Sequence, residues 1–141
     1  MLSIKRLDLA DAGLMIEGAA AHAREIGVPM CIAVTDESGN LIAFERMDGG
    51  KVTSITVAQD KAFTAAAARK ATHEYNQACT PGNLVFGIHT AFGGRLSVVG
   101  GGLPVELDGA VVGGIGISSG TPQQDMACAQ AGIYYWRRYQ G

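Results

Sequence analysis

The chain has 141 residues and a mass of 14.6 kDa, a length that predicts a single domain spanning residues 1–141. Hydrophobic residues make up 48% of the sequence and charged residues 17%, which excludes a disordered, highly charged chain. Eleven basic and thirteen acidic residues give a formal net charge of −2 without a Lys/Arg block, so we expect no nucleic-acid partner and no membrane partner.

The first expected elements are a helix and a β-hairpin. Residues 8–26 predict the helix, because Asp8 can cap its first turn and Gly27 ends it. The apolar runs at residues 30–35 and 41–46 are separated by a polar turn that contains Gly and Asn. Such a turn closes a hairpin, so we expect these two strands to be antiparallel.

A second long helix and a segment with weaker signals follow. The helix is expected over residues 53–72, and its middle, residues 62–68, consists almost entirely of small side chains. Such a helix can approach a sheet or a partner subunit closely. Residues 73–96 contain several glycines and irregularly spaced apolar residues. This pattern favours a lid or a pocket-lining segment over a regular element.

The last third of the sequence predicts short strands and a final helix. The strands are expected at residues 96–99, 103–107 and 110–117, and an Asp-Gly pair between the last two predicts a second hairpin. The helix is expected from Thr121 to about Tyr139, because its first residues have the capping-box pattern. The complete order predicts an α+β fold, in which an antiparallel sheet of about five strands is flanked by helices.

Cysteine usage indicates a reducing compartment, and the hydropathy pattern predicts no membrane helix. Cys31, Cys79 and Cys128 are odd in number and form no C-x-x-C pair, so we expect reduced thiols that serve as small buried apolar residues. No apolar run reaches the roughly 18 residues of a membrane helix. The first residues lack the apolar segment of a signal peptide. The expected location is the cytoplasm.

His22 is the candidate metal ligand. It falls on the face of the first helix that also carries Met15, Ala19 and Ile26. One imidazole nitrogen is sufficient to ligate a haem iron. The alternative is a histidine at the edge of the core, with one ring nitrogen bound to a carbonyl. The three histidines are too far apart in the sequence for a helical zinc pair.

Charged residues after the first hairpin form a second candidate site. Arg46 can hold a carboxylate, such as a haem propionate or an organic acid, through its guanidinium. Asp48, Lys61 and His89 are candidates for proton transfer, and Lys61 is also a candidate partner for a propionate. Alternatively, Arg46 and Asp48 pair with neighbouring residues and only fix the loop.

Two turns rich in glycine or serine can offer backbone N–H groups to an anion. Gly101 and Gly102 belong to a Gly-Gly-Gly-Leu-Pro run that lacks the context of a nucleotide-binding motif. Ser118, Ser119 and Thr121 precede the final helix, whose N-terminus can bind a carboxylate or a phosphate. Plain capping of that helix by Thr121 is the alternative.

Four stretches, in order along nearly the whole chain, form a recognisable pattern. They are residues 27–49 (GVPMCIAVTDESGNLIAFERMDG), 61–66 (KAFTAA), 101–105 (GGLPV) and 108–129 (DGAVVGGIGISSGTPQQDMACA). Together they resemble the GlcG/HbpS-like family, also called the haem-degrading domain family, which includes the C-terminal domain of PduO-type proteins.

This resemblance implies a profilin-like α+β domain, a homo-oligomer of even order and, for some members, binding of haem or a corrinoid-related ligand. It places His22 on the helix where a ligand to the haem iron is expected. The positions that match the family pattern, and are therefore candidates for a ligand pocket or a structural role, are Arg46, Met47, Asp48, Lys61, Gly101, Gly102 and Thr121.

Three functions remain open at this point. The first is an oligomeric protein that binds haem, or a related planar or acidic ligand, in one cavity on which His22 and Arg46 converge. The second is a small-molecule enzyme that acts on an organic or aromatic acid in a catabolic pathway, with Arg46 holding the carboxylate. The third is a non-catalytic accessory subunit, held by the Ala-rich helix and the Tyr/Trp-rich end of the chain.

Overall fold

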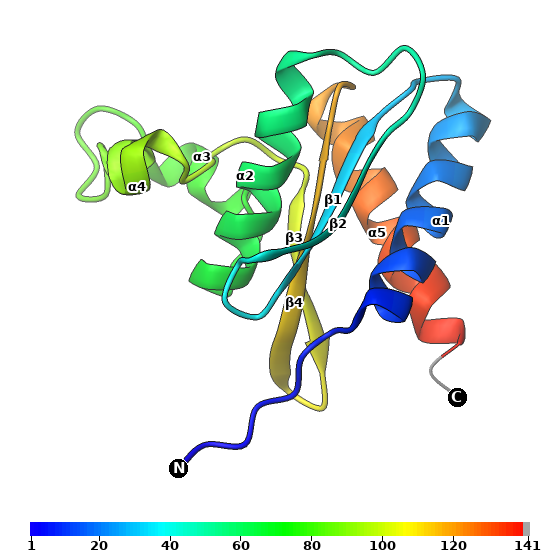
Figure 1. Cartoon of the computed structure of the whole chain (residues 1–141). Coiled ribbons are helices and arrows are strands. Elements are labelled where there is room, and N and C mark those ends of the chain that lie inside the picture. The colour runs from blue at the N-terminus through cyan, green and yellow to red at the C-terminus, as the bar shows by residue number, and fades with distance from the viewer. Residues whose placement is uncertain (140–141) are drawn as a thin grey trace.

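Helices surround a central sheet in the computed structural model, which describes residues 1–139 (Figure 1). In chain order the elements are α1 (Leu9–Ile26), β1 (Cys31–Asp36), β2 (Leu41–Arg46), α2 (Thr53–Ala68), α3 (Glu74–Ala78), the 3₁₀ helix η1 (Ile88–Thr90), α4 (Ala91–Gly94), β3 (Gly102–Leu107), β4 (Ala110–Ser118) and α5 (Pro122–Arg138). Within the described range, no helix is long and apolar enough to cross a bilayer. The cytoplasmic location and the single domain stay predictions, and the last two residues of that domain lie outside the described range.

The strands over residues 1–139 form one antiparallel sheet in the order β2-β1-β4-β3. Both predicted hairpins are therefore confirmed, as β1 with β2 and β3 with β4. The expected strand at residues 96–99 is wrong, and the sheet has four strands instead of about five. The reason is a contact outside the sheet, because the Ser97 backbone N–H donates to Thr64 Oγ1 of α2 at 2.8 Å.

On the face of the sheet that α2 covers, the central strands carry small side chains, and Phe44 of the edge strand β2 packs at the margin. Cys31 and Ala33 of β1 pack on alanines of this helix. Gly114 and Gly116 of β4 approach its backbone so closely that a Cβ at Gly116 would lie 2.1 Å from the Ala58 carbonyl oxygen. Glycine is needed at such positions because another backbone occupies the place of the side chain. The glycines of β4 therefore let α2 lie directly on the sheet.

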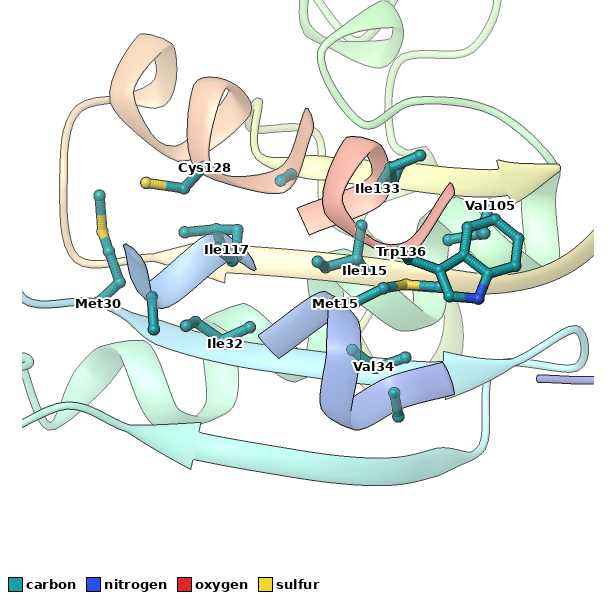
Figure 2. Close-up of a cluster of buried hydrophobic side chains, with 14 of the residues drawn as sticks. Met15, Met30, Ile32, Val34, Val105, Ile115, Ile117, Cys128, Ile133 and Trp136 are labelled. Carbon is teal, nitrogen blue, oxygen red and sulfur yellow. The ribbon is translucent and has the colours of Figure 1, made fainter. Parts of the chain in front are cut away.

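The opposite face of the sheet carries the large apolar side chains. They fill the space between the sheet and helices α1 and α5, as Figure 2 shows for Ile32, Val34, Ile115 and Ile117. Trp136 of α5 is only 1% exposed, and its indole N–H donates to Asp11 Oδ1 of α1 at 2.9 Å. Each large apolar side chain buried here contributes about 1.5–3 kcal/mol. This layer forms the main core and holds α1 beside α5.

The helix ends follow the local signals in the sequence, with one difference. Asp8 and Thr121 each form a capping box with the residue three positions later, at the start of α1 and of α5. The second helix ends at Ala68 instead of at residue 72. Arg69 adopts a left-handed conformation with φ 55°, and its N–H closes the last turn of the helix.

Residues 73–95 form a lobe that projects from the α2 side of the sheet (Figure 1). The lobe contains α3, η1 and α4. It is fixed to α2 by an edge-on contact between the rings of Phe92 and Phe63, 5.3 Å apart, and by an ion pair of 3.1 Å between Arg95 and Asp60. The lobe therefore lies away from α1 and α5, on the other side of the sheet.

Candidate functional site

Helices α1 and α5 cross at two glycines. A Cβ at Gly18 would lie 2.4 Å from the Cβ of Tyr135, and a Cβ at Gly132 would lie 2.7 Å from the Met15 carbonyl oxygen. Each helix therefore places a glycine where the other comes nearest. The short separation brings the polar side chains that flank the crossing on both helices close to one another.

The outer side of this crossing is an open groove of about 730 Å³. That volume lies within the usual range for small-molecule sites, roughly 300–1,000 Å³. Small side chains of both helices line its middle, namely those of Gly18, Ala21 and Ala131. The polar lining comes from α1 and from the C-terminal half of α5, namely His22, Glu25, Tyr134, Tyr135, Arg137 and Arg138.

His22 presents one ring nitrogen to a carboxylate and leaves the other available. Its side chain is 31% exposed, and its Nδ1 lies 3.6 Å from Glu25 Oε2. At this distance the two groups attract one another electrostatically, although the contact is too long for a hydrogen bond. The contact with Glu25 involves Nδ1, on the side of the ring opposite to Nε2. Nε2 can therefore act as an electron-pair donor to a ligand in the groove.

The α5 side of the groove is cationic and aromatic. Arg137 and Arg138 lie in the last turn of α5, and the Arg138 guanidinium carbon lies 5.3 Å from the centre of the Tyr135 ring. The Tyr135 hydroxyl donates to Glu17 Oε1 at 2.8 Å. Hydrogen bonds with Tyr139 and Glu17 raise the pKa of Tyr135, so its phenol stays neutral at neutral pH. The net charge of this side comes from the two arginines.

Arg46 does not share this groove with His22. It pairs with Cys31 across β1 and β2, and opposite residues of an antiparallel pair point to the same face. Cys31 packs against α2, so Arg46 lies on the α2 face, whereas α1 and His22 lie beyond the other face. The prediction that His22 and Arg46 converge on one cavity is therefore wrong for the single chain.

Lys61, Gly101 and Gly102 come together in the interior. Lys61 Nζ lies 2.9 Å from Asp125 Oδ2. A Cβ at Gly101 would lie 2.8 Å from this ammonium, and a Cβ at Gly102 would lie 2.5 Å from the Lys61 carbonyl oxygen. The two glycines therefore make room for the lysine and for the helix that carries it.

The remaining candidate residues lie apart from one another. Asp48 is exposed in the turn after β2. Thr121 caps α5, and Ser119 accepts a hydrogen bond from the Lys51 N–H at 3.0 Å. His89 is exposed on the lobe. Because Lys61 is buried in an ion pair and His89 lies on the lobe, the four residues considered for catalysis do not form one constellation.

The groove residues of α5 were not recognised as site residues from the sequence. The sequence placed Tyr134, Arg137 and Arg138 only within the Tyr/Trp-rich end of the chain, as part of a contact with another subunit or of a helix end that covers the sheet. A signal was present, because both α1 and α5 carry a glycine within an otherwise apolar face, at Gly18 and Gly132. Matching these glycines would have placed the two helices in contact.

The architecture and the groove define a small α+β domain with an imidazole-bearing cleft between two helices on one face of its sheet. The family model described as "Haem degrading protein HbpS-like" matches residues 7–134. The chain belongs to this HbpS-like family, and the resemblance stated from the sequence is confirmed.

Individual relatives agree with this assignment. The chain is 39% identical over 130 residues to an uncharacterized 15.0 kDa protein from the dhaT-dhaS intergenic region of Citrobacter freundii, and the match covers 92% of each protein. Its fold is similar to that of the Klebsiella pneumoniae protein ORFY, with a TM-score of 0.95, 32% identity and coverage of 97% and 94%. It is also similar to PduOC in the crystal structure of the PduOC:heme complex, with a TM-score of 0.89, 32% identity and coverage of 92% and 94%.

Proposed function

We propose that this chain binds haem in the groove between α1 and α5, with His22 Nε2 as a ligand to the iron. The observation that carries the proposal is the position of His22, which opens into a groove of about 730 Å³ with one ring nitrogen beside Glu25. The solved complex of a similar chain with heme, and the name of the family, support the choice of ligand.

The residues of the groove fit the chemistry of haem. A neutral imidazole is a usual ligand for haem iron, and the small side chains of Gly18, Ala21 and Ala131 leave room for a planar ring. Arg137 and Arg138 are suited to pair with the propionates, because guanidinium groups bind carboxylates through two parallel hydrogen bonds. When bound, haem would supply a redox-active iron. The chain itself would orient the ring and hold its acidic edge.

This assignment differs from the sequence-based one in the propionate partners. Arg46 and Lys61 were expected in that role. Lys61 has a side chain that is 2% exposed and is engaged by Asp125, whereas Arg46 lies on the α2 face of the sheet. The two arginines at the end of α5 line the same groove as His22. They replace Arg46 and Lys61 as the proposed partners.

Titration with hemin tests the proposal. The wild-type protein is expected to show a saturable shift of the Soret band, and His22→Ala is expected to lose it. His73→Ala is the matched control, because His73 is an exposed histidine on the lobe side of the molecule and its Cβ is kept. A His22→Ala variant that titrates like the wild type would exclude His22 as the ligand. Absence of any saturable shift in the wild type would exclude haem.

We further propose that the chain assembles into a homo-oligomer of even order. The exposed apolar side chains of Val52 and Val57, at the start of α2, support an interface that includes this end of the helix. Val57→Glu is expected to reduce the mass measured by sedimentation velocity, whereas Gln123→Glu at the exposed start of α5 is expected to leave it unchanged. A wild-type monomer would contradict the proposal.

A further inference from the structure

A cysteine and a histidine meet on the lobe, far from the α1–α5 groove. Cys79 Sγ lies 3.1 Å from Nδ1 of His89, a residue ten positions later in the chain. Cys79 is partly exposed and His89 is exposed. The lobe that carries both residues projects from the body of the molecule (Figure 1). The contact therefore joins a nucleophilic atom to a base at a place that small molecules can reach.

Local backbone contacts hold the two side chains at this distance. Cys79 follows α3, and its N–H donates to the Tyr75 carbonyl at 2.8 Å. His89 lies in the single turn η1, where Thr90 closes the turn by donating from both its N–H and its hydroxyl to the Gly87 carbonyl, at 3.0 and 2.7 Å. The Phe86 ring lies beside the imidazole, with 5.8 Å between the ring centres.

The turn between the two residues is also tied to α3. The Asn83 side chain donates to the Gln77 carbonyl at 2.9 Å and to Thr80 Oγ1 at 2.7 Å. The Asn83 N–H closes the same turn on the Thr80 carbonyl at 3.1 Å. These bonds fix the path of the chain from Cys79 toward His89. The thiol and the imidazole are therefore held together by the fold of the lobe.

The pair has the geometry of an activated thiol. A nucleophile and a base within about 2.6–3.2 Å can exchange a proton directly. When the neutral imidazole carries its proton on Nε2, Nδ1 accepts the thiol proton, and the products are a thiolate and an imidazolium. The thiolate is the reactive form of cysteine. His89 thus supplies the base that Cys79 needs.

The other two cysteines lack these features. Cys31 and Cys128 are fully buried, and burial raises the pKa of both thiols, that of Cys128 to about 11. A high pKa leaves little thiolate at neutral pH. The expectation that all three cysteines are buried apolar residues is therefore correct for Cys31 and Cys128 and wrong for Cys79. Cys79 therefore differs from Cys31 and Cys128 in exposure and in having a histidine partner, and the two buried cysteines serve as controls.

The residues around Cys79 and His89 favour thiol–disulfide exchange over metal binding. Within residues 1–139, no cluster of three or more His, Cys, Asp or Glu side chains is placed to hold a metal ion, so the pair is not part of a larger chelate. Thiol–disulfide exchange needs only a thiolate, access for a disulfide and a proton for the departing thiol. A thiol and an imidazole on an open surface supply these requirements.

We propose that Cys79 is a nucleophilic thiol, with His89 as its base, that undergoes exchange with small-molecule disulfides. The Cys79 thiolate attacks one sulfur of the disulfide, a new S–S bond forms and the original S–S bond breaks. The departing thiolate takes the proton that His89 holds and leaves as a thiol. Cys79 is oxidised to a mixed disulfide and the departing sulfur is reduced, so electrons and protons balance. The modification is reversed by an excess of thiol.

The reaction of the whole chain with 5,5′-dithiobis(2-nitrobenzoate) at pH 7 tests this inference. One thiol per chain is expected to react at least about ten times faster than N-acetylcysteine, because a base within hydrogen-bond reach typically accelerates such steps by 10²–10⁴. Cys79→Ser is expected to remove this fast phase and leave only the slow reaction of the buried thiols. Mass spectrometry is expected to find the mixed disulfide on Cys79 and its loss after addition of a reductant.

Substitution of His89 shows whether the Cys79 thiol reacts fast because the histidine activates it or only because it is exposed. His89→Ala is expected to slow the fast phase about tenfold or more, whereas His73→Ala, at the exposed start of the same lobe, keeps the wild-type rate. Thermal unfolding of each variant shows whether the fold is kept. A wild-type rate equal to that of N-acetylcysteine would overturn the inference. So would an unchanged rate in His89→Ala, or a fast phase that persists in Cys79→Ser. The hemin titration is a separate readout, so the two proposals can fail independently.

Discussion

Lys61 and Asp125 form an ion pair in the interior, with 2.9 Å between Nζ and Oδ2 and side chains that are only 2% and 3% exposed. Lys61 also donates to the Ile117 carbonyl at 2.9 Å, and Asp125 Oδ1 accepts the Gly120 N–H at 3.0 Å. The pair therefore connects α2, β4 and the start of α5. Both charges are partnered, which is the condition under which buried ions are tolerated.

Replacing one partner of this pair should be costly. Lys61→Met is expected to lower the free energy of unfolding at pH 7 by about 3–5 kcal/mol, because the Asp125 carboxylate would stay buried without its cation. Urea denaturation measures the change. Lys5→Met is the control, because Lys5 pairs with Asp108 at an exposed site and such pairs contribute about 0–1 kcal/mol. Equal losses in both variants would contradict a special role for the buried pair.

The loss in free energy of unfolding caused by Lys61→Met should depend on pH. Burial raises the pKa of the Asp125 carboxyl, and the charge of Lys61 opposes that rise. A carboxyl whose pKa is higher in the folded state than in the unfolded state stabilises the fold while it is protonated, at a pH below the unfolded pKa. This stabilisation is lost as the pH rises through the folded pKa and the carboxyl becomes a buried charge. Removing Lys61 raises the folded pKa further. The stability deficit is therefore expected to shrink as the pH falls from 7 toward 4, and a constant deficit over this range would refute the explanation.

Two glycine-to-alanine substitutions should change the stability of the fold in opposite directions. Gly116→Ala is expected to destabilise the fold by at least about 3 kcal/mol, because the new Cβ would meet the α2 backbone at Ala58 and Ala62. Gly13→Ala is expected to stabilise it by about 0.5–1 kcal/mol, because Gly13 is exposed in α1 with nothing within 4 Å of a new Cβ. Thermal unfolding compares the two variants. A loss of stability in Gly13→Ala, or none in Gly116→Ala, would contradict this account of the packing.

Features that depend on neighbouring residues could be predicted from the sequence. Caps, turns and hairpins are determined within a few residues, which explains why the capping box at Thr121 and both antiparallel pairs were expected correctly. The strand expected at residues 96–99 failed because its apolar pattern is local, whereas its hydrogen bond to Thr64 is not.

Contacts that depend on how the helices and strands pack could not be predicted from the sequence. The face on which Arg46 lies follows from its pairing with Cys31, and a shift of one residue would have placed it on the face toward His22. The contact of Cys79 with His89 depends on a turn of irregular backbone that no periodicity describes. A candidate residue could be named from its type, but its partner could not.

The arginines at the end of α5 should contribute to haem affinity. The double variant Arg137→Ala/Arg138→Ala is expected to weaken hemin binding about tenfold, since two partly exposed ion pairs contribute about 0.5–1 kcal/mol each. Arg24→Ala is the matched control, because Arg24 lies on α1 and lines a different cavity with Phe44 and Glu45. Equal affinity of the double variant and the wild type would remove the arginines from the proposed site.

Thr121 should affect stability and leave haem binding unchanged. Its hydroxyl accepts the Gln124 N–H at 3.2 Å, and the Gln124 side chain accepts the Thr121 N–H at 2.9 Å. Thr121→Ala removes the first of these bonds and is expected to lower the free energy of unfolding by about 1 kcal/mol. Thr121 lies about 24 Å along the helix from Arg137, at a rise of about 1.5 Å per residue. Urea denaturation and hemin titration of the same variant separate the two roles. Loss of a residue that holds the cofactor would lower the affinity for hemin. Loss of a helix cap lowers only the urea concentration at the unfolding midpoint.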